Sequence, residues 1–462
     1  MGVSMETPAA AGELDVRNQP KNDELDQMNS EVDEKQDFTP AYQQDAFGNE
    51  EFAEVKYKVL RWWQCGLLMV AETVSLGVLS LPAAIAAMGF VPSVIVLIGL
   101  GIITTYTGFI MGQMKLRYPQ ITTMADAGEV IAGKFGREFI GAAWSIFFVF
   151  IMASHLLTFT VAMNTITNHG TCTVVFGIVG MILSFICTLP RTLEKMSWLS
   201  IVSFVSILSA VLITMIALGI DKPGAGLIAV ANTNLYHGFT AVTNIVFAFC
   251  SHGAFFGLMA ELRNPRDFTK SLCLLQGIDI SLYLITAVVI YRYAGDGVTS
   301  PALGSASPLI SKIAYGIALP TIVIAGVING HVAVKYIYVR IFRGTDRMHK
   351  RDAIAIGSWI GIALTMWILA WIIASAIPVF SNLLSLITAL FASWFSFGFP
   401  SILWMHMNKG VYFSSPRKIT LTVINLIIIG IAFALCGMGL WVSGKAIHDD
   451  PSSASFSCAN NA

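Results

Sequence analysis

The chain has 462 residues, of which 55% are apolar and only 12% are charged, and its 28 basic and 28 acidic residues cancel. A soluble domain carries about 25% charged residues, so this composition leaves too little polar surface for a soluble enzyme of this length. The 29 phenylalanines and 10 tryptophans exclude disorder along most of the chain, and the neutral charge balance excludes a basic nucleic-acid-binding protein.

The neutral total conceals two oppositely charged regions. Residues 1–60 hold 14 acidic and 5 basic residues, a net charge of −9, whereas residues 61–462 hold 14 acidic and 23 basic residues, a net charge of +9. The first sixty residues are too polar to bury a core, so we expect a disordered, acidic, cytoplasmic tail. This tail lacks the basic segment followed by an apolar segment that is typical of a signal peptide.

The rest of the chain consists of long apolar runs separated by short polar breaks, and each run is about long enough to cross a bilayer. We therefore predict an all-α integral membrane protein with a transmembrane domain over 61–445 and a short exoplasmic tail over 446–462. The eleven predicted spans are Gly66–Met88, Ser93–Met114, Glu138–Met163, Thr173–Pro190, Leu199–Ile220, Phe239–Ala260, Ser271–Arg292, Pro308–Ala333, Ala353–Ile377, Asn382–Met405 and Ile419–Ser443.

Basic residues in the loops predict the orientation. With a cytoplasmic N-terminus, eleven spans place 21 Lys and Arg on the cytoplasmic side and 4 on the other, without counting three in the distal tail. Such a bias is typical of cytoplasmic loops, so we expect the C-terminus to be extracellular. Cys172 and Cys458 both fall on the outer side, where oxidation can join them, although two free thiols are the alternative.

The sequence contains none of the motifs that we associate with enzymes of common classes. His-Glu-x-x-His, Cys-x-x-Cys, Gly-x-Ser-x-Gly and the Walker A pattern are all missing, and no acid–base pairs lie within the spans. A channel would require a repeated selectivity filter or a ring of charges, which are missing as well. We therefore expect neither an enzyme nor a channel, and no bound cofactor.

Two spans carry residues that interrupt a helix at mid-membrane. Span 1 contains Gly77 and Pro82, and span 6 contains the sequence Ser251-His252-Gly253. Ordinary glycine packing between helices is the alternative interpretation of either break alone. Breaks at corresponding places in two halves of a chain, however, are the best sequence indication of the central site of a transporter.

The breaks also indicate a substrate. Freed N–H groups at a helix N-terminus suit a carboxylate, and freed carbonyls suit an ammonium group, so a zwitterionic amino acid fits both. No Lys or Arg lies near either break, and we expect Phe247, Phe249, Phe255 and Phe256 to form an apolar pocket for a neutral or aromatic side chain. The predicted substrate-binding residues are Ser75, Leu76, Gly77, Val78, Phe249, Cys250, Ser251 and His252.

These motifs resemble those of the amino acid/auxin permease family, and in particular those of fungal neutral amino acid permeases. The similarity rests on Ser75–Ala84 (S-L-G-V-L-S-L-P-A-A), on the F-A-F-x-x-H pattern of Phe247–His252 and on the eleven-span layout, and it covers about 55–445. The resemblance implies a LeuT-type fold: inverted five-helix repeats over about 66–220 and 239–405, plus an extra helix over about 419–443. It also implies proton-coupled amino acid uptake. Family members usually have Gly-x-Gly where this chain has Ser75-Leu76-Gly77.

Polar residues inside spans are candidates for proton coupling because they are costly in a bilayer. Glu72, Asp279 and His252 are the predicted coupling residues, and His155 is a further candidate whose alternative role is core packing. Glu72 could instead be a structural carboxylate that is paired with Arg61. The resemblance also bears on the ion, because span 8 contributes sodium-ligating hydroxyls in sodium-coupled LeuT-type relatives. Here Ile322–Ala333 contains no Ser or Thr, only Asn329, which favours protons as the coupling ion.

We therefore expect a proton symporter that imports neutral amino acids across the plasma membrane, with the lipid bilayer as its surroundings. A vacuolar or endosomal amino acid exporter and a transport-inactive amino acid sensor are the alternatives. The tail lysines are possible ubiquitin acceptors, namely Lys21, Lys35, Lys56 and Lys58.

Overall fold

A computed structural model describes most of the transmembrane region. The compact unit Asp45–Ala462 contains all the described residues and is distinct from Met1–Gln44. The predicted acidic tail, with Lys21, Lys35 and Lys56, therefore lies outside the described residues, apart from positions 58 and 60. The described residues are 58, 60–190, 196–224, 226–342, 352–449 and 455–461.

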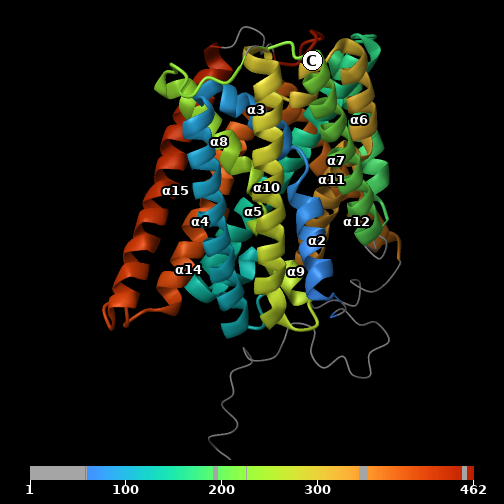
Figure 1. Ribbon diagram of the computed structural model, residues 1–462. Coiled ribbons are helices and arrows are strands. Elements are labelled where there is room, and N and C mark those ends of the chain that lie inside the picture. Colours follow the sequence, from blue (N-terminus) through green and yellow to red (C-terminus); the bar gives the residue numbers. More distant parts are fainter. Residues whose placement is uncertain are drawn as a thin grey trace, which may run out of the picture. The chain divides into compact units, whose positions relative to one another are not determined.

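Helices make up almost all of the secondary structure in these ranges (Figure 1). An isolated β-bridge between Leu60 and Leu262 is the one extended pairing that they contain. The longer helices are α2 (Trp62–Thr73), α3 (Gly77–Met88), α4 (Phe90–Arg117), α5 (Met124–Thr167), α6 (Thr173–Thr188), α7 (Met196–Asp221), α8 (Leu235–Ala248), α9 (His252–Ala260), α10 (Phe268–Ala294), α11 (Pro308–Phe342), α12 (Ala353–Ala376), α13 (Phe380–Ile387), the π-helical segment η5 (Thr388–Gly398), α14 (Phe399–Met407) and α15 (Pro416–Asp449).

Each of the eleven predicted apolar runs coincides with one of these helices or with a broken series of them. Within the described ranges, nine helical segments are long and apolar enough to span a membrane, and the bent pair α2 and α3 makes a tenth. Helix α6 has only 16 residues. At 1.5 Å per residue it is about 24 Å long, less than the roughly 30 Å of a bilayer core. The predicted count of eleven spans is therefore not confirmed.

The third predicted span starts at Glu138, but α5 starts earlier, at Met124. Thr123 caps this helix, because its hydroxyl accepts the Asp126 N–H at 3.2 Å while the Asp126 carboxylate accepts the Thr123 N–H at 2.9 Å. The helix is then interrupted at Ala132 and Gly133, and Gly133 has a φ of +59°. The first turns of α5 thus form a separate capped helix before the span itself.

The distribution of exposed apolar side chains fits a protein surrounded by lipid. Ile95 and Ile102 on α4 are 66% and 63% exposed, and Phe433 on α15 is 61% exposed. Such rows of exposed aliphatic and aromatic groups would be costly in water but not in a bilayer. Helix α15 is the least buried of the spanning helices and lies at one edge in Figure 1, whereas α5 is among the most buried.

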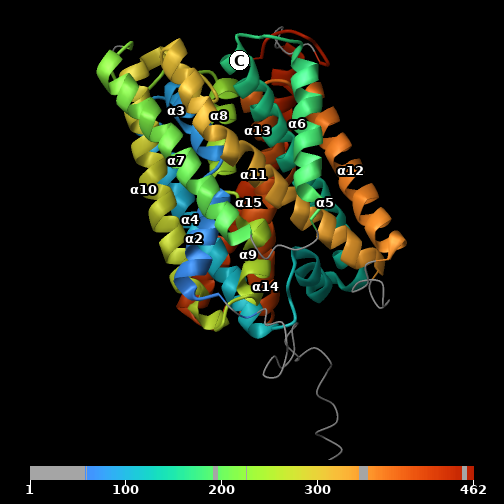
Figure 2. The same ribbon diagram turned by 90° about the vertical axis from the view of Figure 1, so that its right-hand side faces the viewer.

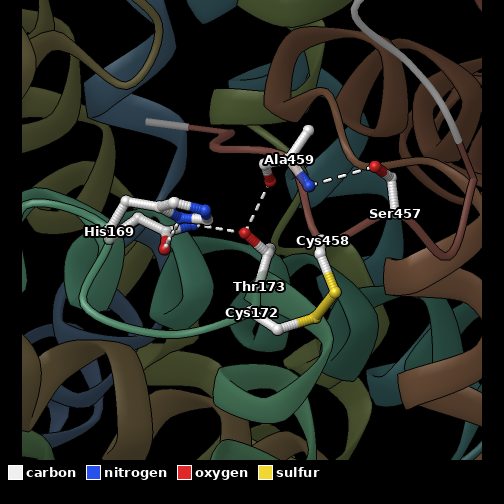
Figure 3. The surroundings of a disulfide bond; sticks show 7 residues. His169, Cys172, Thr173, Ser457, Cys458 and Ala459 are labelled. Carbon is white, nitrogen blue, oxygen red and sulfur yellow. Dashed lines mark hydrogen bonds between the residues drawn. A yellow bond between two sulfur atoms is a disulfide. The ribbon is translucent and has the colours of Figure 1, made fainter.

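A disulfide bond joins Cys172, at the start of α6, to Cys458 near the C-terminus (Figure 3). Hydrogen bonds reinforce this attachment: the Thr173 hydroxyl donates to the Ala459 carbonyl at 2.6 Å, and the Phe456 N–H donates to the Ser375 carbonyl at 2.9 Å. Of the two possibilities that the sequence left open, the structure has the paired cysteines. Residues 455–461 are thereby fastened to α6 and to the end of α12.

Candidate functional site

Two helices are broken in the middle of the helical region, as the sequence predicts. The first break, Val74–Leu76, separates α2 from α3, which are bent by 57° relative to each other. The second break, Phe249–Ser251, separates α8 from α9. Both breaks lie slightly N-terminal to their predicted places, since Gly77 and His252 already belong to the following helices. Pro82 does not interrupt the first pair but lies within α3.

The backbone near the breaks is partly satisfied by short local hydrogen bonds. The Ser75 N–H donates to the Thr73 carbonyl at 2.9 Å, and the Cys250 N–H donates to the Phe247 carbonyl at 3.0 Å. The Ser80 hydroxyl donates to the Gly77 carbonyl at 2.8 Å. These bonds matter because water is scarce inside a membrane, where every unpaired backbone group is costly.

The two breaks face a common cavity of about 60 Å³, which has room for a few water molecules. Its walls come from α2, α3, α5, α8, α9 and α11 and from both breaks. Figures 1 and 2 show α3 and α8 in the upper part of the described unit and α2 and α9 in the lower part. The lining residues are Glu72, Thr73, Ser75, Leu76, Gly77, Phe147, Phe148, Ile151, His155, Phe247, Ala248, Cys250, Ser251, Gly253, Ala254 and Asn329.

Helix ends give this cavity both signs of partial charge. Helices α3 and α9 begin at the breaks with their positive N-termini, and α2 and α8 end there with their negative C-termini. The lining includes one carboxylate, that of Glu72, and contains no Lys or Arg. The cavity can therefore neutralise an anionic and a cationic group of one small molecule without a basic side chain.

The structure brings most of the predicted binding residues to the cavity but not all of them. Ser75, Leu76, Gly77, Cys250 and Ser251 line it. The other predicted binding residues, Val78, Phe249 and His252, are fully buried and are not part of the lining.

His252 faces α4 instead of the cavity. Its Nε2 atom lies 2.9 Å from the Thr107 hydroxyl and 3.2 Å from the Thr104 carbonyl. Asp279, on α10, is fully buried, and neither of its carboxylate oxygens has a hydrogen-bond partner among the described residues. These two predicted coupling residues thus lie in the packed interior around α4 and α10, away from the cavity lining.

The apolar wall differs from the expected one. Of the four phenylalanines predicted to form it, only Phe247 lines the cavity, while Phe255 packs against Phe268 at 5.6 Å between ring centroids. Phe147 and Phe148 of α5 take the place of the other three. The sequence carries no signal for this exchange, because α5 is aromatic along much of its length and only tertiary packing selects the side that meets the breaks.

His155 and Asn329 also line the cavity. The Nδ1 atom of His155 lies 3.0 Å from the Ile322 carbonyl, and the Asn329 amide donates to the Ala325 carbonyl at 2.8 Å. The sequence argument mentioned Asn329 only within a segment that lacks sodium-ligating hydroxyls, although a buried amide within a span is itself a signal of a polar site.

Glu72 lies in the last turn of α2 and reaches the cavity. Arg61 precedes the first residue of that helix, about 16 Å away along its axis at 1.5 Å per residue. In the part of the chain that the structure describes, no ion pair joins these two side chains. The alternative of a structural Glu72–Arg61 pair is therefore not what the structure has.

Close packing at the first break yields a stability prediction. A Cβ atom on Gly77 would lie 2.6 Å from the Ala248 Cα, whereas one on Gly99 of α4 would meet nothing within 4 Å. We expect Gly77→Ala to destabilise the protein by about 1–3 kcal/mol through overpacking, and Gly99→Ala to leave it unchanged or slightly more stable. Thermal unfolding of the two purified variants measures the difference, and equal midpoints would contradict the prediction.

The chain is similar to known membrane transport proteins. The family model described as "Transmembrane amino acid transporter protein" matches residues 58–444. An N amino acid transport system protein from Neurospora crassa is 38% identical to the chain over 405 residues, which cover 85% of this chain and 86% of the relative.

Two solved structures share the fold. A nucleobase-cation-symport-1 family transporter in a closed conformation with bromovinylhydantoin bound has a TM-score of 0.53 and 13% identity, and the match covers 89% of this chain and 98% of that one. A sodium-coupled sialic acid symporter has a TM-score of 0.51 and 12% identity, with 82% and 90% covered. The predicted LeuT-type fold is confirmed. The chain is a multi-pass membrane transporter, not an enzyme, and it belongs to the transmembrane amino acid transporter family, also called the amino acid/auxin permease family.

Proposed function

We propose that this protein imports neutral amino acids by proton symport, with the cavity between the two breaks exposed alternately to each side of the membrane. The observation that carries the proposal is the convergence of two helix N-termini and two helix C-termini on one cavity with no basic side chain. A zwitterion satisfies both kinds of helix end, whereas an additional charge on the substrate would lack a partner.

The substrate orientation follows from these helix ends. The carboxylate faces the N-termini of α3 and α9, and the ammonium group faces the C-termini of α2 and α8. The side chain then extends toward Phe147, Phe148 and Phe247, which form the aromatic part of the lining. This wall favours apolar and aromatic side chains, and Ser75 and Ser251 offer hydroxyls to the polar groups of the substrate.

Uptake into proteoliposomes tests the substrate and the ion together. We expect labelled neutral amino acids to accumulate under an inward proton gradient and not under an inward sodium gradient at equal pH. Acidic and basic amino acids should compete at least tenfold less well, because each leaves a charge unpaired in the cavity. Accumulation under sodium alone, or a preference for charged amino acids, would contradict the proposal.

Glu72 is the proposed proton carrier because of its place. It is the one carboxylate in the cavity lining, it sits in the last turn before the first break, and no ion pair with Arg61 fixes its charge. A carboxylate that changes its charge beside the substrate ammonium gives the two protonation states different substrate affinities, and such a difference is what couples two ligands.

The substitution Glu72→Gln removes the exchangeable proton while keeping the shape of the side chain. We expect this variant to lose accumulation driven by a pH gradient but to retain exchange of labelled for unlabelled substrate, which needs no net proton movement. Glu129→Gln is the control, since Glu129 is a carboxylate of α5 that is paired with Arg137 at 2.9 Å, away from the cavity lining. An unchanged pH dependence in Glu72→Gln would return the role to Asp279 or His252.

The loop charges favour a cytoplasmic N-terminus and a C-terminus on the opposite side of the membrane. We propose that this membrane is the plasma membrane, so that the C-terminus is extracellular. The disulfide near the C-terminus is consistent with this side, because such bonds persist in oxidising surroundings. The proposed transporter consists of two inverted repeats, over about 66–220 and 239–405. The proposal also includes ubiquitin attachment to lysines of the N-terminal tail.

A membrane-impermeant reductant tests the orientation and the membrane at once. In a variant that keeps only Cys172 and Cys458, we expect the reductant to break the disulfide in intact cells, as detected by subsequent alkylation of both thiols. Cells with a permeabilised plasma membrane are the control for complete reduction. Reduction only after permeabilisation would instead favour the vacuolar or endosomal exporter. In the proteoliposome experiment, binding of amino acids without any flux would favour the sensor.

A further inference from the structure

Tyr283 of α10 joins the two broken helices through one hydroxyl group. Its phenol oxygen lies 2.9 Å from the Ala248 carbonyl and 3.2 Å from the Thr73 carbonyl. Ala248 is the last residue of α8, and Thr73 is the last residue of α2. The Tyr283 side chain therefore reaches the C-terminal ends of α2 and α8, which are the first halves of the two broken helices.

Both carbonyls lie at helix C-termini, where donors are scarce, although the Thr73 carbonyl also accepts the Ser75 N–H at 2.9 Å. The last carbonyls of a helix lack intrahelical donors and carry the negative end of the helix dipole. In transporters with broken helices such carbonyls commonly bind a coupling cation. Here the shared hydroxyl proton of Tyr283 supplies positive charge between the two helix ends.

The surroundings hold the phenol ring in place. Tyr283 is fully buried, and the edge-to-face contact between its ring and that of Phe249 has a centroid distance of 5.2 Å. Phe249 directly follows Ala248 in the chain, so the ring is packed against the same break to which its hydroxyl donates. Gly77 also packs closely against Ala248, since a Cβ atom on Gly77 would lie 2.6 Å from the Ala248 Cα.

Tyr283 does not belong to the cavity lining. It therefore acts on the helix ends and not on the substrate. We propose that Tyr283 is a positioning residue that holds the ends of α2 and α8 together, so that the two broken helices open as one unit. This inference rests on the proposed alternating access of the cavity, but it does not depend on the nature of the ion or of the amino acid.

The reactivity of Cys250 provides a test that needs no transport. This cysteine lies in the second break and lines the cavity, so its alkylation rate reports how often the break opens. In a background in which the other four free cysteines are serine, Tyr283→Phe removes only the hydroxyl. The Ala248 carbonyl then loses the Tyr283 donor, and the Thr73 carbonyl keeps only the Ser75 N–H, so we expect the alkylation rate of Cys250 to rise about tenfold.

Tyr291→Phe is the matched control. Tyr291 is an equally buried tyrosine of the same helix, and its hydroxyl is 3.4 Å from the Ile228 N–H, away from both breaks. We expect this variant to keep the parental alkylation rate. Tyr283→Met also lacks a donor and replaces Tyr283→Phe in the same measurement if the latter does not fold.

The substrate dependence of uptake separates positioning from binding. For Tyr283→Phe we expect a KM within about twofold of the parental value, since the phenol does not touch the cavity. An unchanged alkylation rate of Cys250 would overturn the proposal. A tenfold higher KM without faster alkylation would overturn it too, because Tyr283 would then act on the substrate. Neither result depends on proton coupling, so the two proposals can fail separately.

Discussion

A helix that is interrupted inside a bilayer exposes backbone N–H and C=O groups in a place where water cannot satisfy them, and the arrangement of this protein depends on how these groups are paired. Local turns satisfy some of them, such as the Ser75 N–H, which bonds to the Thr73 carbonyl. Tyr283 contributes a donor from a neighbouring helix. The groups that remain at the helix ends line a cavity, where a charged small molecule can complete the pairing.

The same constraint explains which residues surround the breaks. Gly77 is packed so closely against Ala248 that a larger residue has no space, and this contact brings the start of α3 beside the end of α8. Trp144 of α5 donates from its indole nitrogen to the Gly253 carbonyl at 3.2 Å, so α5 supports the first turn of α9. Close contacts on both sides thus hold the ends of the short helices next to the breaks.

The division between the cavity and the packed interior separates the titratable groups into two sets. Glu72 and His155 line the cavity, whereas His252 and Asp279 lie among α4, α9 and α10. A group in the first set can respond directly to a bound substrate. A group in the second set can affect the substrate only by shifting the helices that carry it, and this physical difference gives Glu72 priority as the proposed proton carrier.

The sequence by itself determined the membrane class, the approximate bounds of the helices and the existence of both breaks, whose places it gave to within a few residues. These features depend on apolar runs and on glycine, serine and proline at particular places, and such local signals can be read without knowing what packs against them. It did not determine that Phe147 and Phe148, rather than Phe249 and Phe255, line the cavity, nor that His252 faces α4. Which side of a uniformly apolar helix meets the cavity depends on rotation and on neighbours far away in the chain. The hydroxyl of Tyr283 likewise bonds to Thr73 and Ala248, which are 210 and 35 positions away in the chain, so only the tertiary structure could bring these residues together.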